Sequence, residues 1–182
     1  QPMPMDLARV YQELSNNADG IVSIHLPAKL SGTYNSAIQG KVIARAKCDI
    51  EIIDSQSISM GLGLIVMAAA RIAKTGATIQ QVIKETRKII PKVHILAMMD
   101  TLKYLFAGGR ISRTKATIGS LLQVKPLLSL RDGEIFQAGF ARTFDKGLEY
   151  QYQFVKNIAH VQEVAIVHST TPQKANELKN HL

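Results

Sequence analysis

The chain has 182 residues, of which 46% are apolar, 5% aromatic and 20% charged, and its formal net charge is +8. This composition is typical of a globular protein, and no apolar stretch reaches the roughly 18 to 20 residues that a membrane span needs. The basic residues are spread along the chain with few aromatic side chains to stack on bases, so we expect no nucleic-acid partner. The single cysteine, Cys48, excludes an internal disulfide, and no secretory leader is visible, so we expect a cytoplasmic protein.

The first half of the chain predicts alternating helices and strands. Apolar residues recur there with helical spacing or in short β-branched runs, and proline, glycine and capping residues separate the segments. In chain order the predicted elements are a helix after Pro4 with Leu7, Val10, Tyr11 and Leu14 on one face, a strand over 21–26, a helix from about Ser31, a strand over 50–53 ending at Asp54, an apolar helix ending before Gly76, and a helix capped by Thr78. Strands joined by helical crossovers pair in parallel, so this half predicts a parallel α/β layer.

The second half predicts antiparallel pairing. Its strongest local signal is Asp132-Gly133, a dipeptide typical of a two-residue hairpin turn. In chain order the predicted elements are a strand over 93–97, helices over 101–107 and 115–122, strands over 126–130 and 135–140, a helix over about 144–159, a strand over 164–167, and a helix begun by Thr171-Pro172. The fold class is therefore α/β, with a parallel α/β layer followed by a mixed α+β second domain that contains a β-hairpin. We expect the domains to be 1–84 and 85–182.

The segment from Leu30 to Tyr34 places small hydroxyl and glycine residues where a predicted strand has ended and a helix begins. A helix N-terminus exposes backbone N–H groups and a partial positive charge, and Gly32 would let a ligand approach the backbone closely. Ser31, Gly32 and Thr33 are therefore candidates for binding an anionic head group. The alternative is that Ser31 only caps the helix.

A serine-dependent lipid or ester hydrolase is the alternative from another functional class. Ser31, His25 and Asp54 lie near the ends of neighbouring predicted strands, where a catalytic triad could assemble. The G-x-S-x-G nucleophile elbow is absent, however. The alternation of His25 with Ile24 and Leu26 is also explained by a half-buried strand position. A third hypothesis, a DNA-associated regulator, follows from the positive charge alone.

Two arginines follow structural breaks in the second half. Arg110 comes directly after Gly108-Gly109, and Arg142 follows the predicted strand that ends at Phe140. A guanidinium group can bind a carboxylate or phosphate with two parallel hydrogen bonds. Both residues are therefore candidate ligand-binding arginines, and a solvated surface position is the alternative for each.

Several short motifs in a fixed order make the chain similar to the DegV family. Each is unspecific alone, but together they cover nearly the whole sequence. They are Gln1-Pro2, Leu30-Ser31-Gly32-Thr33-Tyr34 with Ser36-Ala37, Ile53-Asp54-Ser55, Ser59-Met60-Gly61-Leu62-Gly63, Asp100-Thr101-Leu102-Lys103-Tyr104-Leu105, Gly108-Gly109-Arg110-Ile111-Ser112, Lys125-Pro126, Gly133 and Arg142-Thr143. The family's upstream Thr-Ser pair and its C-terminal Gly-x-His-x-Gly-Pro-Gly motif are not present, so we expect a chain shown without its ends.

The resemblance implies a two-domain carrier that encloses a long-chain fatty acid between its domains and has no catalytic activity. It implies a fatty-acid site that includes Ser31, Gly32 and Thr33, while Arg110 and Arg142 match arginine positions of the family motifs. No cofactor or metal is implied beyond the bound fatty acid. For some bacterial members the resemblance further implies an ATP-dependent fatty acid kinase as the partner that receives the carboxylate.

Overall fold

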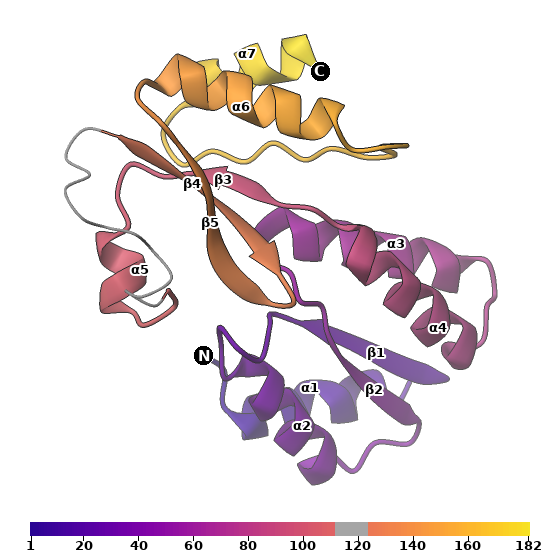
Figure 1. The fold of residues 1–182 in the computed structure, drawn as a ribbon. Helices are drawn as coiled ribbons and strands as arrows, with labels where there is room; N and C mark the ends of the chain where they lie inside the picture. Colours follow the sequence, from indigo (N-terminus) through magenta and orange to yellow (C-terminus); the bar gives the residue numbers. More distant parts are fainter. Residues whose placement is uncertain (112–123) are drawn as a thin grey trace. The chain divides into compact units, whose positions relative to one another are not determined.

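The computed structural model describes residues 1–111 and 124–182; the predicted helix over 115–122 lies outside them. The chain divides into two compact units. The first comprises Gln1–Val93 with Asp132–Glu134, and the second comprises His94–Arg131 with Ile135–Leu182. Each unit is built around its own small sheet (Figure 1).

In the first unit, two strands and their crossover helices form the predicted parallel layer. Strand β1 (Gly20–His25) pairs in parallel with β2 (Asp49–Asp54), and the register places His25 beside Asp54. Helices α1 (Pro4–Leu14) and α2 (Thr33–Ile43) lie on one face of this pair, while α3 (Ser59–Lys74) and α4 (Ile79–Ile89) lie on the other (Figure 1). A 3-10 turn, Ile90–Lys92, follows α4.

The core between the strands and the first two helices explains which face of α1 is buried. Tyr11 packs with Ile21, Ala37 and Ile50, and is only 2% exposed. Val10 and Leu14, which helical spacing puts on the same face as Tyr11, are nevertheless 47% and 50% exposed. The face is set by the close approach of the two helices at Gly40. A Cβ there would lie 3.2 Å from the backbone nitrogen of Ala8, so the row through Ala8 and Tyr11 faces inward.

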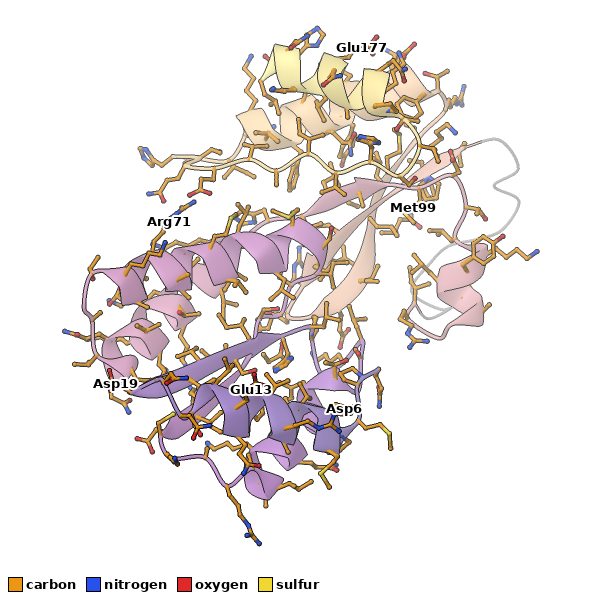
Figure 2. All side chains as sticks on the ribbon, turned by 180° about the vertical axis from the view of Figure 1, so that it is seen from behind. Asp6, Glu13, Asp19, Arg71, Met99 and Glu177 are labelled. Atoms are coloured by element: carbon orange, nitrogen blue, oxygen red, sulfur yellow. The ribbon has the colours of Figure 1, made fainter. Side chains whose placement is uncertain are left out.

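The opposite face of α1 is polar. Asp6 and Glu13 lie along it and are exposed (Figure 2). Asp6 also accepts a hydrogen bond from the backbone N–H of Met3, at 3.1 Å, and so stabilises the start of the helix. This polar side accounts for the amphipathic pattern that predicts the helix.

The turn between α3 and α4 confirms two local predictions. Gly76 follows the end of α3 with φ +81°, a left-handed conformation that glycine adopts without steric cost. Thr78 caps α4: its side chain accepts a hydrogen bond from the backbone N–H of Gln81, whose own side chain bonds back to the Thr78 N–H. Val82, Ile83 and Thr86 of α4 are buried.

The second unit contains the predicted antiparallel sheet, in the order β3-β4-β5. The strands are β3 (Leu96–Met98), β4 (Lys125–Arg131) and β5 (Glu134–Ala141), and the helices are α5 (Lys103–Ala107), α6 (Phe144–Lys156) and α7 (Pro172–His181). Asp132 and Gly133 join β4 to β5 with φ of 51° and 73°, as a hairpin turn of two left-handed residues requires. Helix α6 packs against β3 and β4, with α7 beside it (Figure 1).

One predicted strand is absent from the second unit as described. Residues 164–167 form no strand, and Val164 and Val167 are 47% and 61% exposed. Their β-branched composition is typical of a strand, but a strand forms only where its backbone groups find a partner. No strand among residues 1–111 and 124–182 pairs with this segment.

Candidate functional site

The loop that follows β1 brings three of the predicted site residues together. The backbone N–H groups of Leu30 and Ser31 both donate to the carbonyl of Pro27, which turns the chain before α2. The Ser31 hydroxyl lies 2.9 Å from the Thr33 hydroxyl and accepts a hydrogen bond from the Thr33 backbone N–H at 3.2 Å. The N-cap residue is Gly32, so Ser31 precedes the cap and is not the cap itself.

Helix α2 begins with unsatisfied backbone donors. Gly32 offers no side chain to cap the helix, and no described residue accepts a hydrogen bond from the N–H groups of Tyr34 or Asn35. The first turn of a helix leaves such N–H groups for a capping side chain, for water or for an anionic ligand. Chemically, the loop can therefore hold a small anionic group through backbone N–H donors and two hydroxyls.

The end of β2 is tied to the same loop. The Asp54 carboxylate accepts hydrogen bonds from the backbone N–H of Ala28 at 3.0 Å and of Gln56 at 2.8 Å. The backbone N–H of Ser55 also donates to the carbonyl of His25, at 3.0 Å. Asp54 therefore organises the loops after both strands, which is a structural role.

A cavity of about 320 Å³ in the first unit opens beside this loop. Its polar lining comes from Tyr34, Asp54, Gln56 and Arg87, and the rest of the lining is aliphatic. Tyr34 directly follows Thr33, so the cavity and the start of α2 share a wall.

A half-buried hydrogen-bond cluster joins α1 to β1. The Tyr11 hydroxyl lies 2.8 Å from the Ser23 hydroxyl and 3.3 Å from His25 Nε2, and the Ser23 hydroxyl lies 2.7 Å from the same nitrogen. Burial lowers the pKa of His25 below its usual 6.5, because a desolvated imidazolium is unfavourable. Burial raises the pKa of Tyr11 because a desolvated phenolate is also unfavourable, and the hydrogen bond between Tyr11 and Ser23 opposes this shift.

These contacts do not assemble the hydrolase triad. His25 is bonded to Ser23 and Tyr11, Ser31 to Thr33, and Asp54 to two backbone N–H groups. A triad needs the base within hydrogen-bond reach of the nucleophile and of a carboxylate that orients it. In the structure no side-chain hydrogen bond joins any two of these three candidate residues.

The two candidate arginines belong to the second unit. Arg110 folds back so that its Nη1 donates to the carbonyl of Gly108. Arg142 is exposed and has no partner among the described residues. It directly precedes Thr143, whose side chain caps α6 by accepting from the backbone N–H of Lys146 at 3.2 Å.

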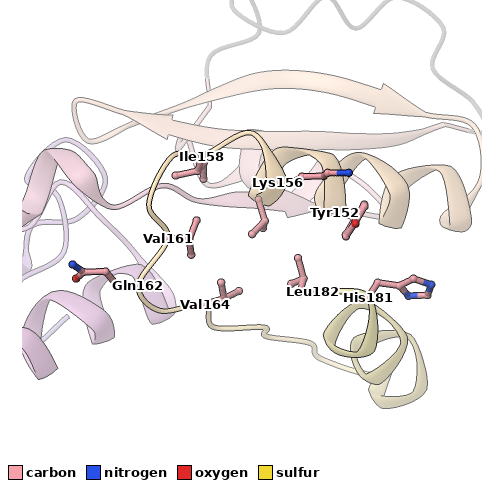
Figure 3. Close-up of a pocket in the computed structure, with 9 residues that line it drawn as sticks. Tyr152, Lys156, Ile158, Val161, Gln162, Val164, His181 and Leu182 are labelled. Atoms are coloured by element: carbon pink, nitrogen blue, oxygen red, sulfur yellow. The ribbon is translucent and has the colours of Figure 1, made fainter.

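The second unit has a cavity of its own, of about 450 Å³ (Figure 3). Its lining is mixed, with apolar side chains such as Ile158, Val161 and Val164 beside the polar ends of Lys156 and His181. Sequence reasoning did not indicate it, because the lining comes from α6, from the extended segment after it and from the end of α7.

One neighbour of the site was missed by the sequence reasoning. The side chain of Gln1 lies over Gly32: a Cβ placed on that glycine would meet the Gln1 Oε1, and would lie 2.8 Å from its Nε2. Gln1 and Gly32 are far apart in the sequence, and only their membership in the same series of motifs could have pointed to the pair.

Neither a metal site nor a membrane-spanning helix is found where the chain is described. Across residues 1–111 and 124–182, no group of three or more His, Cys, Asp or Glu side chains is arranged to hold a metal ion. None of the helices in these ranges combines the length and the apolar character that crossing a membrane takes.

Comparison with known proteins identifies similar chains. The family model described as "Uncharacterised protein, DegV family" matches residues 1–182. A DegV domain-containing protein of Caldanaerobacter subterraneus is 35% identical over 185 residues, covering 98% of this chain and 65% of that protein. The chain thus spans slightly less than two thirds of the length of this relative.

Solved structures show the same fold. A DegV family protein of Thermus thermophilus, described by its fatty acid binding, is 33% identical with a TM-score of 0.79, over 88% of this chain and 56% of that one. A DegV family protein of Ruminococcus gnavus, refined with vaccenic acid, is 27% identical with a TM-score of 0.88, over 99% of this chain and 65% of that one.

Proposed function

The chain belongs to the DegV family, and from this premise we propose that it is a cytoplasmic, non-catalytic carrier that binds a long-chain fatty acid. The carboxylate of the bound fatty acid is held by Ser31, Gly32 and Thr33 at the start of α2. The observation that carries the proposal is the agreement between two independent features. Similar structures bind fatty acids, and this chain presents unsatisfied N–H donors beside two hydroxyls at one helix N-terminus.

The tail and the head group of a fatty acid contribute differently to the free energy of binding. Each buried methylene group contributes about 0.8 kcal/mol, so a long acyl tail dominates the affinity. A carboxylate at a helix N-terminus gains only about 0.3 to 2 kcal/mol. The tail therefore sets how tightly the ligand binds, and Ser31 and its neighbours set how the carboxylate is oriented.

Analysis of the bound lipid tests the carrier function directly. The full-length protein is purified, denatured and extracted, and the released lipid is analysed by mass spectrometry. We expect long-chain fatty acid in a ratio near one per chain. Absence of lipid, together with no binding of added palmitate or oleate, would overturn the proposal.

A hydroxyl deletion tests the head-group site. Ser31→Ala should weaken fatty-acid binding by about 0.5 to 1.5 kcal/mol, or up to roughly 3 kcal/mol if the carboxylate is the acceptor. Thr75→Ala is the matched control, because it removes a hydroxyl that donates to the Ile72 carbonyl at the far end of α3. Equal affinities of the wild type, Ser31→Ala and the control would reduce Ser31 to a loop residue that bonds only to Thr33.

The carrier presents the carboxylate to an ATP-dependent fatty acid kinase, and basic side chains of the second unit steer that partner. Arg142, exposed and without a described partner, is the best candidate for this role. Arg142→Ala should lower acyl-phosphate formation in a reconstituted kinase assay more than it lowers fatty-acid affinity. Equal losses in both measurements would instead assign Arg142 to the lipid site, and Arg110→Ala is compared in the same assay.

A further inference from the structure

Helix α2 carries apolar side chains on both of its faces, but only one face is packed. Ala37 and Gly40 are buried against the strands and α1. Ile38 and Val42 stand one helical turn apart on the other face, where they are 40% and 82% exposed. A helix that is apolar all round is normally buried, yet no other described element of the first unit lies on the outer side of α1 and α2 (Figure 1). The outer face of α2 is therefore an apolar surface without a described partner.

Basic residues border this surface. Lys41 follows Ile38 by three positions, which places the two side chains next to each other on the helix. Arg45 and Lys47 follow in the segment after α2 ends. All three cations are exposed, and none pairs with a carboxylate among residues 1–111 and 124–182. Several other basic residues of the first unit do form such pairs.

No acidic residue in the surrounding sequence offsets these charges. Between residue 20 and residue 48 the chain contains no Asp or Glu, and the next carboxylate is that of Asp49. The partial negative charge of a helix C-terminus could explain one cation near the end of α2, but it does not account for exposed aliphatic side chains. The segment combines unpaired cations with exposed apolar groups, so its complement is an anionic surface with an apolar interior.

An anionic lipid bilayer fits this surface better than another protein does. Lysine is depleted at protein–protein interfaces, whose binding energy comes mainly from aromatic and arginine side chains seated in pockets. Here the exposed apolar groups are short aliphatic side chains on a convex helix. A second copy of the chain is disfavoured, because two identical basic faces repel each other. Near a bilayer, by contrast, Lys and Arg stems lie along apolar groups while their charges attract anionic lipids.

We infer that the outer face of α2, together with the basic segment after it, docks the protein on membranes that contain anionic lipids. Ile38 and Val42 contact the boundary of the acyl region, and Lys41, Arg45 and Lys47 contact the lipid phosphates. Three cations and two aliphatic side chains give weak binding, so the docking is reversible. This surface is separate from the proposed fatty-acid site. For a fatty-acid carrier, reversible docking brings the ligand site close to a bilayer in which free fatty acids dissolve.

Charge reversal tests the basic part of the surface. Full-length protein is mixed with phosphatidylcholine vesicles that contain about 30% phosphatidylserine, and the bound fraction is measured by co-sedimentation. The double variant Lys41→Glu/Arg45→Glu should lower the partition coefficient at least about tenfold. Lys84→Glu/Lys92→Glu is the matched control, because it changes the net charge equally at exposed positions of α4 and the turn after it. It should lower the coefficient less than about threefold.

A single substitution tests the apolar part. Val42→Ser removes aliphatic groups that leave water on docking, and should lower the partition coefficient on the same vesicles about threefold. Val66→Ser makes the same change at an exposed position of α3, on the other face of the strand pair, and should lower it less than about 1.5-fold. Circular dichroism checks that every variant is folded.

Lipid composition and salt separate specific docking from other outcomes. Vesicles of phosphatidylcholine alone, or an increase in salt from about 0.1 M to about 0.5 M, should each weaken wild-type binding at least about fivefold. Equal losses in the two charge-reversal variants would assign the attraction to net charge and overturn the inference. A wild type that does not bind the anionic vesicles would also overturn it, since the face is then covered by a further segment, a second copy or another protein.

The docking inference and the proposed function fail separately. A full-length protein that binds palmitate but no anionic vesicles loses only the docking surface. A protein that binds the vesicles through α2 but carries no fatty acid loses only the proposed carrier function.

Discussion

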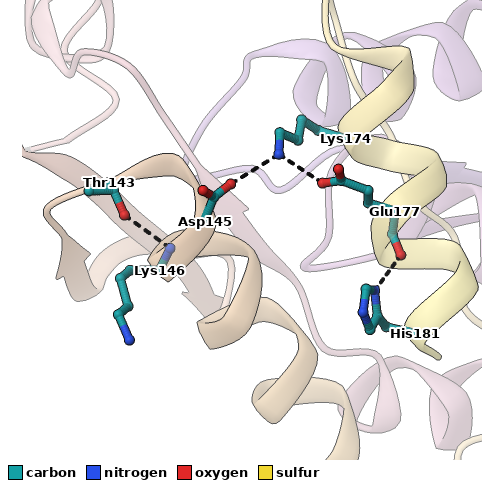
Figure 4. Close-up of polar contacts among 6 residues, drawn as sticks. All are labelled: Thr143, Asp145, Lys146, Lys174, Glu177 and His181. Atoms are coloured by element: carbon teal, nitrogen blue, oxygen red, sulfur yellow. Dashed lines mark hydrogen bonds and ion pairs between the residues drawn. The ribbon is translucent and has the colours of Figure 1, made fainter.

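The two units differ in where they place their polar contacts. In the first unit, Tyr11, Ser23 and His25 share hydrogen bonds beside the apolar cluster that contains the Tyr11 ring. In the second unit, Lys174 contacts Asp145 at 3.0 Å and Glu177 at 2.8 Å on the exposed surface (Figure 4). Both are clusters of three residues, but only the first is partly shielded from water. We therefore expect burial, more than the number of contacts, to determine how much each polar cluster stabilises its unit.

The largest expected effect comes from removing the residue that joins the buried cluster to the core. Tyr11→Ala deletes a ring that is 2% exposed and removes the hydroxyl that contacts both Ser23 and His25. An aromatic residue replaced by alanine in a core costs about 3 to 5 kcal/mol. We expect a loss of this size in the free energy of unfolding, measured by urea denaturation.

Tyr104→Ala is the control for this first prediction. Tyr104 lies in α5 and is 76% exposed, so the same substitution there should change the free energy of unfolding by less than about 0.5 kcal/mol. Similar losses at both tyrosines would remove the basis of the comparison between the two units.

Features of the fold set by neighbouring residues could be read from the sequence. The hairpin turn needs two left-handed residues, and Asp132-Gly133 supplies them. The start of α4 needs a capping pair, and Thr78 with Gln81 provides it. Predictions that depend on distant partners were less successful. Residues 164–167 have strand composition but pair with no described strand, and the buried face of α1 depends on its close approach to Gly40 of α2.

In the candidate site, too, the features set by neighbouring residues could be predicted and those set by distant residues could not. The placement of Ser31 and Thr33 at a helix start follows from the strand-to-loop-to-helix pattern, and the structure brings their hydroxyls together. The partners of His25 could not be predicted, because they require the packing of α1 on β1. The contact between Gln1 and Gly32 could not be predicted either, because the residues around each of them give no signal that the other lies nearby.

The next effect isolates the Tyr11 hydroxyl from its ring. Tyr11→Phe keeps the packed ring, and Ser23 and His25 keep their own 2.7 Å contact. The expected loss is therefore about 0.5 to 1.5 kcal/mol in the free energy of unfolding, the usual net value of one hydrogen bond. A loss as large as that of Tyr11→Ala would mean that the hydroxyl, and not the ring, carries the stabilisation.

The pH dependence of stability sharpens the comparison further. Because burial lowers the pKa of His25 in the folded state, the unfolded chain binds the proton first as the pH falls. The contribution of His25 is therefore complete above about pH 6.5, decreases as the pH falls below that value, and is fully lost once the folded-state pKa is passed. Tyr11 stays protonated throughout, because burial raises its pKa above the usual 10.

Urea denaturation between about pH 7.5 and about pH 5 checks this prediction. His25→Gln should flatten the decrease in stability. His168→Gln, which changes an exposed histidine of the second unit, should leave it unchanged. An equally steep pH dependence in His25→Gln and the wild type would show that other groups cause it.

The smallest effect is expected at the surface cluster of the second unit. Lys174 lies between Asp145 and Glu177, whose side chains are 80% and 51% exposed, and both contacts raise the pKa of Lys174. Water and salt screen charges at such a surface, and two long side chains lose rotational freedom when they pair. Lys174→Met, which retains the aliphatic stem, should therefore shift the urea midpoint less than Tyr11→Phe does, and high salt should abolish the difference. A shift that exceeds that of Tyr11→Phe and persists in salt would show that the cluster stabilises the packing of α7 on α6 as strongly as a buried contact, and burial would then not explain the difference between the units.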